Sequence, residues 1–335
     1  MGNFNKKIRR QIKIGLIARD NNRGLGVQSW EFYKHIKPEK TLVLEIDGEQ
    51  NYPQRYPDAR FCESRISQED IDWLLDGIDL VLTFEDMYNW DIIPQARKKG
   101  VKTVIQLNYE WLRPSSGIPD LYLAPSIWNY EKIPEPKKYL PCPVNRELLP
   151  FQLRKRAKVF FHNAGDGRAA YGRDGTDIVL KAIPLVKSNV KFIINAQYGL
   201  ERIRDNRVEW RIKDYENYWE GIEGDVYLYP RRYGGLSLKL NEAMSKGLVP
   251  IMIDCPPVNT FLPKELLIKP RKLLEIFIQQ WVKWYDISPQ DLAQRIDKIA
   301  NKDITEYSQL SNHIAENWSW EKLLPKYLKT FQYVR

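Results

Sequence analysis

Residues 229–254 read YPRRYGGLSLKLNEAMSKGLVPIMID, and this stretch decides the fold prediction. Its pattern predicts the end of a strand, a tight turn, a short helix over 238–245 and a buried strand over 249–254. Gly234 and Gly235 form the turn, where the lack of a Cβ atom lets the backbone approach a ligand closely. The stretch is therefore typical of a βαβ unit whose turn can bind a ligand.

The start of this helix is a candidate anion site. Ser237 is a favourable N-cap residue, and Gly247 is expected to end the helix. Unpaired N–H groups in the first turn and the helix dipole both favour negative charge, so a phosphate group is expected there. Glu242 shares a face with Leu238, where it can accept hydrogen bonds from the hydroxyls of an attached sugar. The alternative is an ordinary βαβ turn with a solvated Glu242.

Length and charge narrow the class of protein. The chain has 335 residues, which suits two domains, and its 43% hydrophobic content excludes general disorder. The net charge of +9 points to an anionic partner. Nucleic acid, nucleotide phosphates and an anionic membrane surface all meet that description.

Cysteine and histidine usage argues against a metal site. The three cysteines and three histidines are scattered, so neither a disulfide framework nor a histidine-based metal site or triad is expected. The apolar run over 12–18 is short and is interrupted by Lys13, so we expect no signal peptide and no membrane span. These features predict a soluble, cytoplasmic protein that needs no metal.

Strand and helix patterns alternate through both halves, which predicts two parallel sheets covered on both faces. A proline-rich segment over 133–150 is the expected linker. A polar loop with Gly24 and Gly26 follows the first strand. The expected strands cover 12–18, 41–46, 78–83, 101–107, 121–124, 159–162, 191–196, 225–229 and 249–254. The expected helices cover 27–36, 68–75, 92–99, 176–183, 238–245, 273–285, 289–300 and the tail from about 320.

Three segments resemble the retaining glycosyltransferases of the GT-B fold, which use nucleotide-sugar donors. Residues 234–247, GGLSLKLNEAMSKG, fit the family frame E-G-F-G-L-x-x-x-E-A-x-x-x-G in register. The glycine loop over 165–175, followed by Thr176 and Asp177, is similar to the family's G-R…K-G-x-D segment. Residues 318–322, WSWEK, resemble the tryptophan-bearing C-terminal segment that crosses back to the first domain.

This resemblance implies an α/β architecture of two Rossmann-like domains facing each other across a cleft. The first, over 1–145, would bind the acceptor, and the second, over 146–315, would bind the donor. A C-terminal helix over 316–335 would pack back on the first domain. The implied donor is a nucleotide sugar, expected to be a UDP-sugar, with no separate cofactor and no metal.

The resemblance also implies the residues of the donor site. The diphosphate would meet backbone N–H groups at the start of the helix, and Glu242 would accept hydrogen bonds from the ribose. Basic side chains of the glycine loop would supply positive charge, and the glycines of the first domain would approach from the other side. The implied donor-binding residues are Gly24, Gly26, Arg168, Arg173, Gly235, Ser237, Leu238 and Glu242.

Two positions depart from the family pattern. The first glutamate of the family frame falls on Gly234, which leaves the identity of the donor sugar unpredicted. The family lysine falls on Asp174, while Gly167 and Arg168 keep the G-R pair. The neighbouring Arg173 is a candidate to replace the lost charge and to bind a diphosphate bidentately.

Carboxylates that follow strands of the first domain are candidates for the catalytic base. They are Asp20, Glu85 and Glu110, with Asp86 beside them, and ligands bind beyond the carboxyl ends of strands in such sheets. The class is associated with front-side transfer, in which a phosphate oxygen is an alternative base. Ordinary loop carboxylates are the structural alternative.

Aromatic and basic residues are interspersed in the first domain, and they suit the backbone and an extruded base of a nucleic acid. The leading hypothesis is a bacteriophage-type enzyme that glycosylates a hydroxymethylated pyrimidine in duplex DNA, in the host cytoplasm. The alternatives are a cell-surface or lipid-linked glycan at an anionic membrane, a small-molecule acceptor, and an inactive binding protein. No protein partner is predicted. The aromatic residues are Trp30, Tyr33, Tyr52, Tyr56, Tyr88, Trp90, Tyr109 and Trp111.

Overall fold

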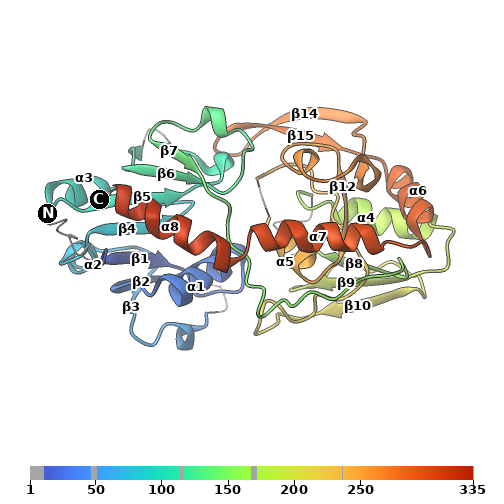
Figure 1. Ribbon diagram of the computed structural model, residues 1–335, viewed down its shortest axis with the longest axis horizontal. Coiled ribbons are helices and arrows are strands. Elements are labelled where there is room, and N and C mark those ends of the chain that lie inside the picture. The colour runs from blue at the N-terminus through green and yellow to red at the C-terminus, as the bar shows by residue number, and fades with distance from the viewer. Residues whose placement is uncertain (1–10, 47–50, 114–115, 167–171, 236, 335) are drawn as a thin grey trace, which may run out of the picture.

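Two α/β domains lie one after the other along the long axis of the molecule (Figure 1). The computed structural model describes residues 11–46, 51–113, 116–166, 172–235 and 237–334. Each domain is built on its own parallel sheet. The predicted α/β architecture of two Rossmann-like domains is confirmed.

The first sheet has, among the described residues, the strand order β3-β2-β1-β4-β5-β6-β7, and all its pairs are parallel. The apolar runs predict its interior strands correctly but not its edge strands, which are short and polar because one side faces solvent. The predicted strands are β1 (Ile14–Ala18), β2 (Lys40–Glu45), β4 (Leu80–Phe84), β5 (Lys102–Gln106) and β6 (Leu121–Ala124). The edge strands are β3 (Arg60–Glu63) and β7 (Lys137–Tyr139).

Two predictions about this domain need correction. Strand β7 lies inside the segment 133–150, so that segment is not wholly an irregular linker. Helix α1 (Gly24–Ile36) begins before the expected position, which puts Gly24 and Gly26 in its first turn rather than in a loop. Helices α2 (Gln68–Leu75) and α3 (Ile92–Lys98) lie where they were expected.

The second sheet has, within the described ranges, the order β10-β9-β8-β11-β12-β13, again all parallel. The two edge strands of this sheet were also not predicted from sequence. The strands predicted are β8 (Val159–Asn163), β9 (Lys191–Ala196), β11 (Val226–Leu228) and β12 (Val249–Ile253), and the edges are β10 (Val208–Ile212) and β13 (Leu267–Ile268). The helices are α4 (Thr176–Ala182), α5 (Leu238–Ser245), α6 (Pro289–Ile299) and α7 (Thr305–Asn317).

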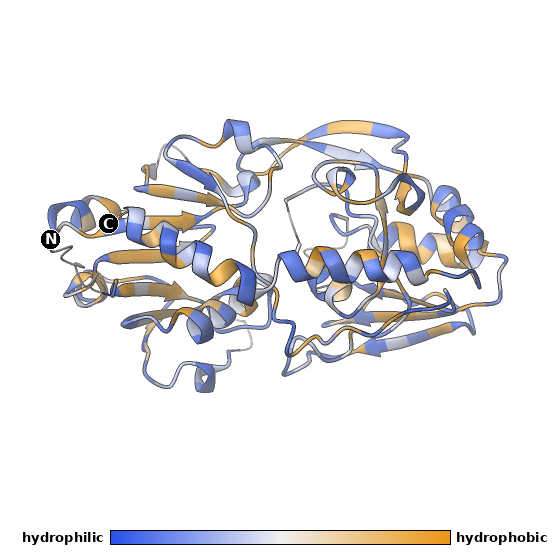
Figure 2. Cartoon of the chain, in the orientation of Figure 1, coloured by the Kyte–Doolittle hydropathy of each residue, from blue (hydrophilic) through white to orange (hydrophobic). Residues whose placement is uncertain are grey.

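Apolar residues concentrate on the central strands of both sheets, whereas the outer helices carry polar residues on one side (Figure 2). Every residue of β1, β4 and β12 is buried, as expected for strands covered by helices on both faces. Burial of these strands is the main favourable contribution to the stability of each domain.

The helix expected over 273–285 is wrong, because the segment is a β-hairpin of β14 (Lys272–Phe277) and β15 (Trp281–Asp286). In β15, Val282 is 2% exposed and joins the core of the first domain, whereas its neighbours Trp281 and Lys283 are exposed. A period of two is that of a strand. The hairpin crosses from the second domain to the first (Figure 1), and Gln280 Nε2 donates to the Leu112 carbonyl at 3.0 Å.

Helix α8 (Trp320–Val334) returns to the first domain (Figure 1), as the resemblance of residues 318–322 implied. Trp320, Tyr327 and Phe331 pack in the same apolar cluster as β1 and β4. Tyr327 Oη accepts a hydrogen bond from Gln106 Nε2 at 2.6 Å and donates to the Pro141 carbonyl at 2.8 Å. The C-terminal helix follows α7 of the second domain in the chain and packs on the first domain.

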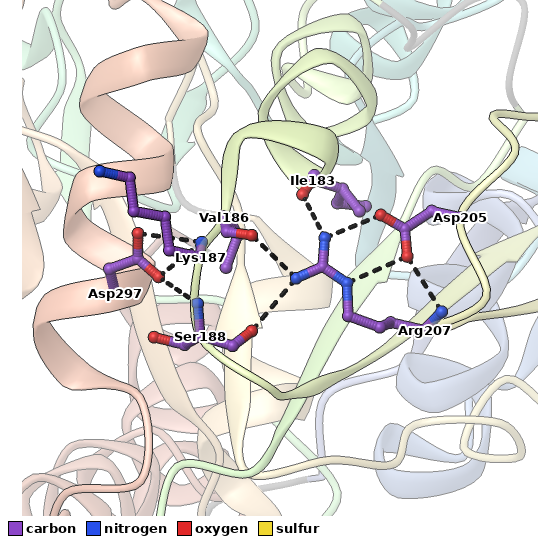
Figure 3. Close-up of polar contacts among 7 residues, drawn as sticks. All are labelled: Ile183, Val186, Lys187, Ser188, Asp205, Arg207 and Asp297. Carbon is purple, nitrogen blue, oxygen red and sulfur yellow. Dashed lines mark hydrogen bonds and ion pairs between the residues drawn. The ribbon is translucent and has the colours of Figure 1, made fainter.

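Arg207 makes several polar contacts within the second domain (Figure 3). Helix α4 ends at Ala182, one residue before the expected end, and a short 3-10 turn over Ile183–Leu185 that contains Pro184 follows. The Arg207 guanidinium donates to three backbone carbonyls in and after this turn, those of Ile183, Val186 and Ser188, at 2.8–3.1 Å. It also pairs with Asp205 at 2.7 Å, so its charge is balanced.

Candidate active site

A cavity of about 400 Å³ lies between the two domains. Its walls come from residues that follow the carboxyl ends of strands in both sheets, the position where open parallel sheets bind ligands. Arg19 follows β1, Glu85 follows β4, and Gln197 follows β9. The wall also includes Gly24, Arg173, Ser237, Leu238 and Glu242 from the predicted donor site.

The start of helix α5 forms part of this wall. Ser237 takes the N-cap position in extended conformation, but its side chain does not cap the helix. Instead, Ser237 Oγ accepts from Tyr229 Oη at 2.8 Å, which corrects the expected capping role. Within the described part of the chain, the backbone N–H groups of Ser237, Leu238 and Lys239 have no acceptor. The helix therefore presents free donors to an anion.

Lys239 supplies the positive charge that the family pattern places elsewhere. Its Nζ lies 2.7 Å from Asp174 Oδ2, and Asp174 occupies the position of the family lysine. Burial alone would raise the pKa of Asp174, but the charges of Lys239, Arg231 and Arg173 outweigh burial and hold this pKa below its usual range. Sequence reasoning missed Lys239, although its place in the first turn of a predicted helix was a usable signal.

Arg173 reaches across the domain boundary. Its Nη2 forms an ion pair with Glu110 Oε1 at 2.7 Å, so two residues predicted for different roles lie in contact. The guanidinium also lies over the ring of Tyr233, 5.1 Å from its centroid. Arg173 is thus fixed beside the cavity by groups from both domains.

Glu242 lies at the base of the cavity and is 8% exposed. Burial raises the pKa of Glu242 to about 8; Lys239 opposes that rise and Glu31 adds to it. The carboxyl group is therefore largely protonated at neutral pH, and it can both donate and accept hydrogen bonds. Such a group suits a pair of vicinal hydroxyls.

Glu85 faces the cavity from the first domain. Its backbone has φ of 61°, a left-handed conformation that is unfavourable for a non-glycine residue and that recurs at functional sites. Asn108 Nδ2 donates to Glu85 Oε1 at 2.5 Å. Burial, with the charge of Glu110 adding to it, raises the pKa of Glu85 to about 7. This carboxyl group can exchange a proton near neutral pH.

The other two candidate bases lie outside the cavity wall. Asp20 is 1% exposed, and its carboxylate oxygens have no hydrogen-bond partner among the described residues. Burial, and then the charge of Glu45, raises the pKa of Asp20 to about 6. Glu110 is equally buried and is engaged by Arg173. Of the three acids proposed from sequence, Glu85 alone lines the cavity.

The predicted glycines differ in how much space a Cβ atom would have at each position. A Cβ on Gly26 would lie 2.0 Å from the Asn21 carbonyl oxygen, so this glycine lets helix α1 fold back on the preceding loop. A Cβ on Gly235 would lie 3.0 Å from Ser126 Oγ of the first domain. Gly24 has open space around it and lines the cavity. Arg168 lies outside the described residues.

The aromatic residues proposed to bind the acceptor pack mostly inside the protein. None of the eight is fully exposed, and Trp111 alone among them lines the cavity. Trp30 stacks on Trp219 of the second domain with ring centroids 6.0 Å apart. Arg55 lies over Trp30 and donates to the Glu216 carbonyl at 2.7 Å. These side chains join the domains rather than form an open stacking surface.

Neither metal ligands nor membrane-spanning helices appear in the described ranges. No three His, Cys, Asp or Glu side chains gather there in a way that could hold a metal ion. None of the described helices combines the length and apolar character required to cross a bilayer.

No protein-family model matches the chain, and no curated protein matches it in sequence. Solved structures do match. A glycosyltransferase from Rickettsia africae aligns with a TM-score of 0.67 at 11% identity, covering 97% of this chain and 99% of its own. Sucrose-phosphate synthase from Thermosynechococcus elongatus gives 0.63 at 12% identity, with 96% and 99% covered. The catalytic domain of starch synthase IV from Arabidopsis thaliana, bound to ADP and acarbose, gives 0.57 at 10% identity, with 96% and 99% covered.

At these identities the likeness concerns the fold alone. It extends over 96–97% of this chain, which contains two parallel sheets and a returning C-terminal helix. The chain therefore has the GT-B fold, two Rossmann-like domains that face each other across a cleft.

Proposed function

We propose that this protein is a retaining glycosyltransferase that transfers a sugar from a UDP-sugar to a hydroxyl group. One observation carries the proposal: the unpaired N–H groups of helix α5 and the Glu242 carboxyl line one cavity with Glu85 of the opposite domain. The GT-B structures that align over the whole chain, one of them with ADP bound, support a nucleotide donor.

In this account, the donor diphosphate binds at the start of helix α5. Backbone N–H groups of Ser237 and Leu238 and the ammonium group of Lys239 stabilise the charge that develops on it as it leaves. Glu242, one turn further along the helix, binds the ribose hydroxyls. A protonated carboxyl at this place adds no negative charge next to the diphosphate.

Glu85 serves as the base in this account. The acceptor oxygen bonds to the anomeric carbon on the face from which the diphosphate departs, and the acceptor proton passes to Glu85. The pKa of about 7 suits that transfer near neutral pH. Asn108 holds one oxygen of the carboxylate and orients it.

For the acceptor, we propose a hydroxymethylated pyrimidine in duplex DNA. The net charge of +9 supports an acceptor with a phosphate backbone. The test is mass spectrometry of DNA containing hydroxymethylcytosine or hydroxymethyluracil after incubation with the protein and mixed UDP-sugars. A mass increase of one sugar on the base is expected, and unchanged DNA with active donor hydrolysis would reject this acceptor.

The hairpin β14–β15 favours a second candidate, a lipid-linked or cell-surface glycan. Leu273, Phe277 and Trp281 are 54–62% exposed on it, with Lys272 and Lys283 on the same hairpin. Exposed apolar side chains beside lysines suit the surface of an anionic membrane. Co-sedimentation with vesicles of phosphatidylglycerol, lost on Trp281→Ser, would favour this acceptor over DNA.

A further inference from the structure

Two guanidinium groups lie beside the glycine turn at Gly234. A Cβ atom on Gly234 would lie 2.3 Å from Arg231 Nη2 and 2.8 Å from Arg173 Nη2. The backbone has φ of +113° there, which glycine adopts without strain. The arginines therefore take the space of any side chain at this position, and the site is positively charged where the family frame has a glutamate.

Arg231 has no anionic partner of its own within the described part of the chain. It is 8% exposed; its Nη1 donates to the Gly235 carbonyl at 2.7 Å, and its Nε is buried without a partner. The nearby Asp174 carboxylate is engaged by Lys239 at 2.7 Å and by Tyr229 at 3.3 Å. Arg231 shares the Asp174 carboxylate with Lys239 and Arg173, so its buried charge is only partly balanced and the site suits an incoming anion.

The position of these arginines relative to helix α5 indicates which part of the donor they meet. Glu242 lies one turn into the helix, beyond the free N–H groups, whereas Gly234 precedes them in the chain. Arg173 extends to Glu110 of the first domain. In a nucleotide sugar the diphosphate separates the ribose from the sugar. With the ribose at Glu242 and the diphosphate at the helix start, the sugar extends toward Arg231 and Arg173, and both line the cavity.

We propose that the donor sugar carries a carboxylate, as in a nucleoside diphosphate uronate, and that Arg231 binds it with Arg173 alongside. This inference rests on the proposed function. The fork of a guanidinium matches the two oxygens of a carboxylate. Because Arg231 is only 8% exposed, a small carboxylate inside the cavity fits this position, whereas the phosphodiester backbone of a polymer does not.

The test is calorimetric titration of the full chain with UDP, UDP-glucose, UDP-glucuronate, UDP-galactose and UDP-galacturonate. Each uronate differs from its hexose partner only at C6. One uronate is expected to bind at least about tenfold more tightly than its partner, the gain of a charge-assisted hydrogen bond. Arg231→Gln is expected to abolish this preference and to change UDP affinity less than about twofold, while Arg231→Lys retains part of it. Circular dichroism and thermal melting confirm that each variant folds.

Three results would overturn the inference, and they differ from one another. UDP could bind while neither uronate exceeds its hexose partner, in which case the donor sugar is neutral. Arg231→Gln could weaken UDP, hexose and uronate equally, in which case Arg231 binds the diphosphate. All five compounds could fail to bind, which would refute the proposed use of a UDP-sugar and this inference with it.

Discussion

Arg173 Nη2 lies 2.7 Å from Glu110 Oε1, an ion pair that joins the second domain to the first at the cavity edge. The Glu110 side chain is almost fully buried, and its backbone carbonyl also accepts from the Gln279 N–H of the crossing hairpin at 3.2 Å. One residue of the first domain thus fixes both a basic side chain at the candidate donor site and the hairpin that crosses between the domains.

Replacing Glu110 by Gln is expected to destabilise the protein, because it leaves the Arg173 charge without its counter-ion. The loss in the free energy of unfolding should be on the order of 3 kcal/mol. Urea denaturation of Glu110→Gln, Arg173→Gln and the double variant measures the coupling. Strictly additive effects would show that the ion pair does not hold the domains together.

Replacing Glu242 by Ala is expected to weaken UDP binding by roughly tenfold, the loss of about one hydrogen-bonded contact. The fold should persist, because the carboxyl group has no hydrogen-bond partner among the described residues. Calorimetric titration measures the affinity, and circular dichroism checks the fold. Unchanged affinity would remove Glu242 from the ribose site.

The pKa of Glu242, raised by burial to about 8 from its ordinary 4.5, predicts a pH dependence. The folded state favours the protonated carboxyl, so this contribution to stability is complete below pH 4.5 and is lost as the pH rises through 8. Glu242→Gln cannot ionise. The Tm of this variant, relative to wild type, should therefore rise by a few degrees between pH 4.5 and 9. A constant difference across that range would contradict the raised pKa.

Replacing Glu85 by Gln is expected to lower kcat by roughly 100-fold or more, because the base is lost while the shape is kept. In the wild type, kcat should rise as the pH increases through about 7, where Glu85 loses its proton. The profile of the variant should be flat over the same range. Full activity of Glu85→Gln would contradict the role of Glu85 as the base and would favour a phosphate oxygen of the donor as the acceptor of the proton.

Replacing Arg207 by Ala is expected to destabilise the second domain without changing the candidate site. It removes three hydrogen bonds to backbone carbonyls and the ion pair with Asp205, a loss of about 2–3 kcal/mol in the free energy of unfolding. Arg207 is not in the cavity wall, so the affinity of the residual folded protein for UDP should be unchanged. A fall in UDP affinity in this variant would contradict the prediction and would show that Arg207 affects donor binding.

Interior strands and most helices could be predicted from sequence, because burial on both faces requires continuous apolar runs. Edge strands such as β7 could not, since a strand paired on one side carries polar residues like those of a loop. The hairpin was misread as a helix because its apolar residues are dense. Its strands pair with each other from Lys272–Asp286 to Phe277–Trp281, and Val282 packs in the core of the first domain.

The candidate site shows the same division. Helix α5 and Glu242 could be located from local pattern, since a glycine turn, an N-cap and a helix are encoded within one segment. Which of Asp20, Glu85 and Glu110 lines the cavity depends on how loops from different strands meet, and adjacent sequence does not specify it. The family lysine is replaced by Asp174, and the lysine that lies beside this position is Lys239. That contact joins residues 65 positions apart in the chain, so local sequence does not predict it.

The central claim, a nucleotide-sugar site at the start of helix α5, is tested most directly by thermal melting with UDP and UDP-sugars. A ligand at 100 times its Kd adds about 2.7 kcal/mol of stability, enough to raise the Tm by several degrees. We predict such a rise for the wild type and for Arg207→Ala, and a smaller rise for Glu242→Ala. If neither UDP nor any UDP-sugar raises the Tm of the wild type, the account is contradicted.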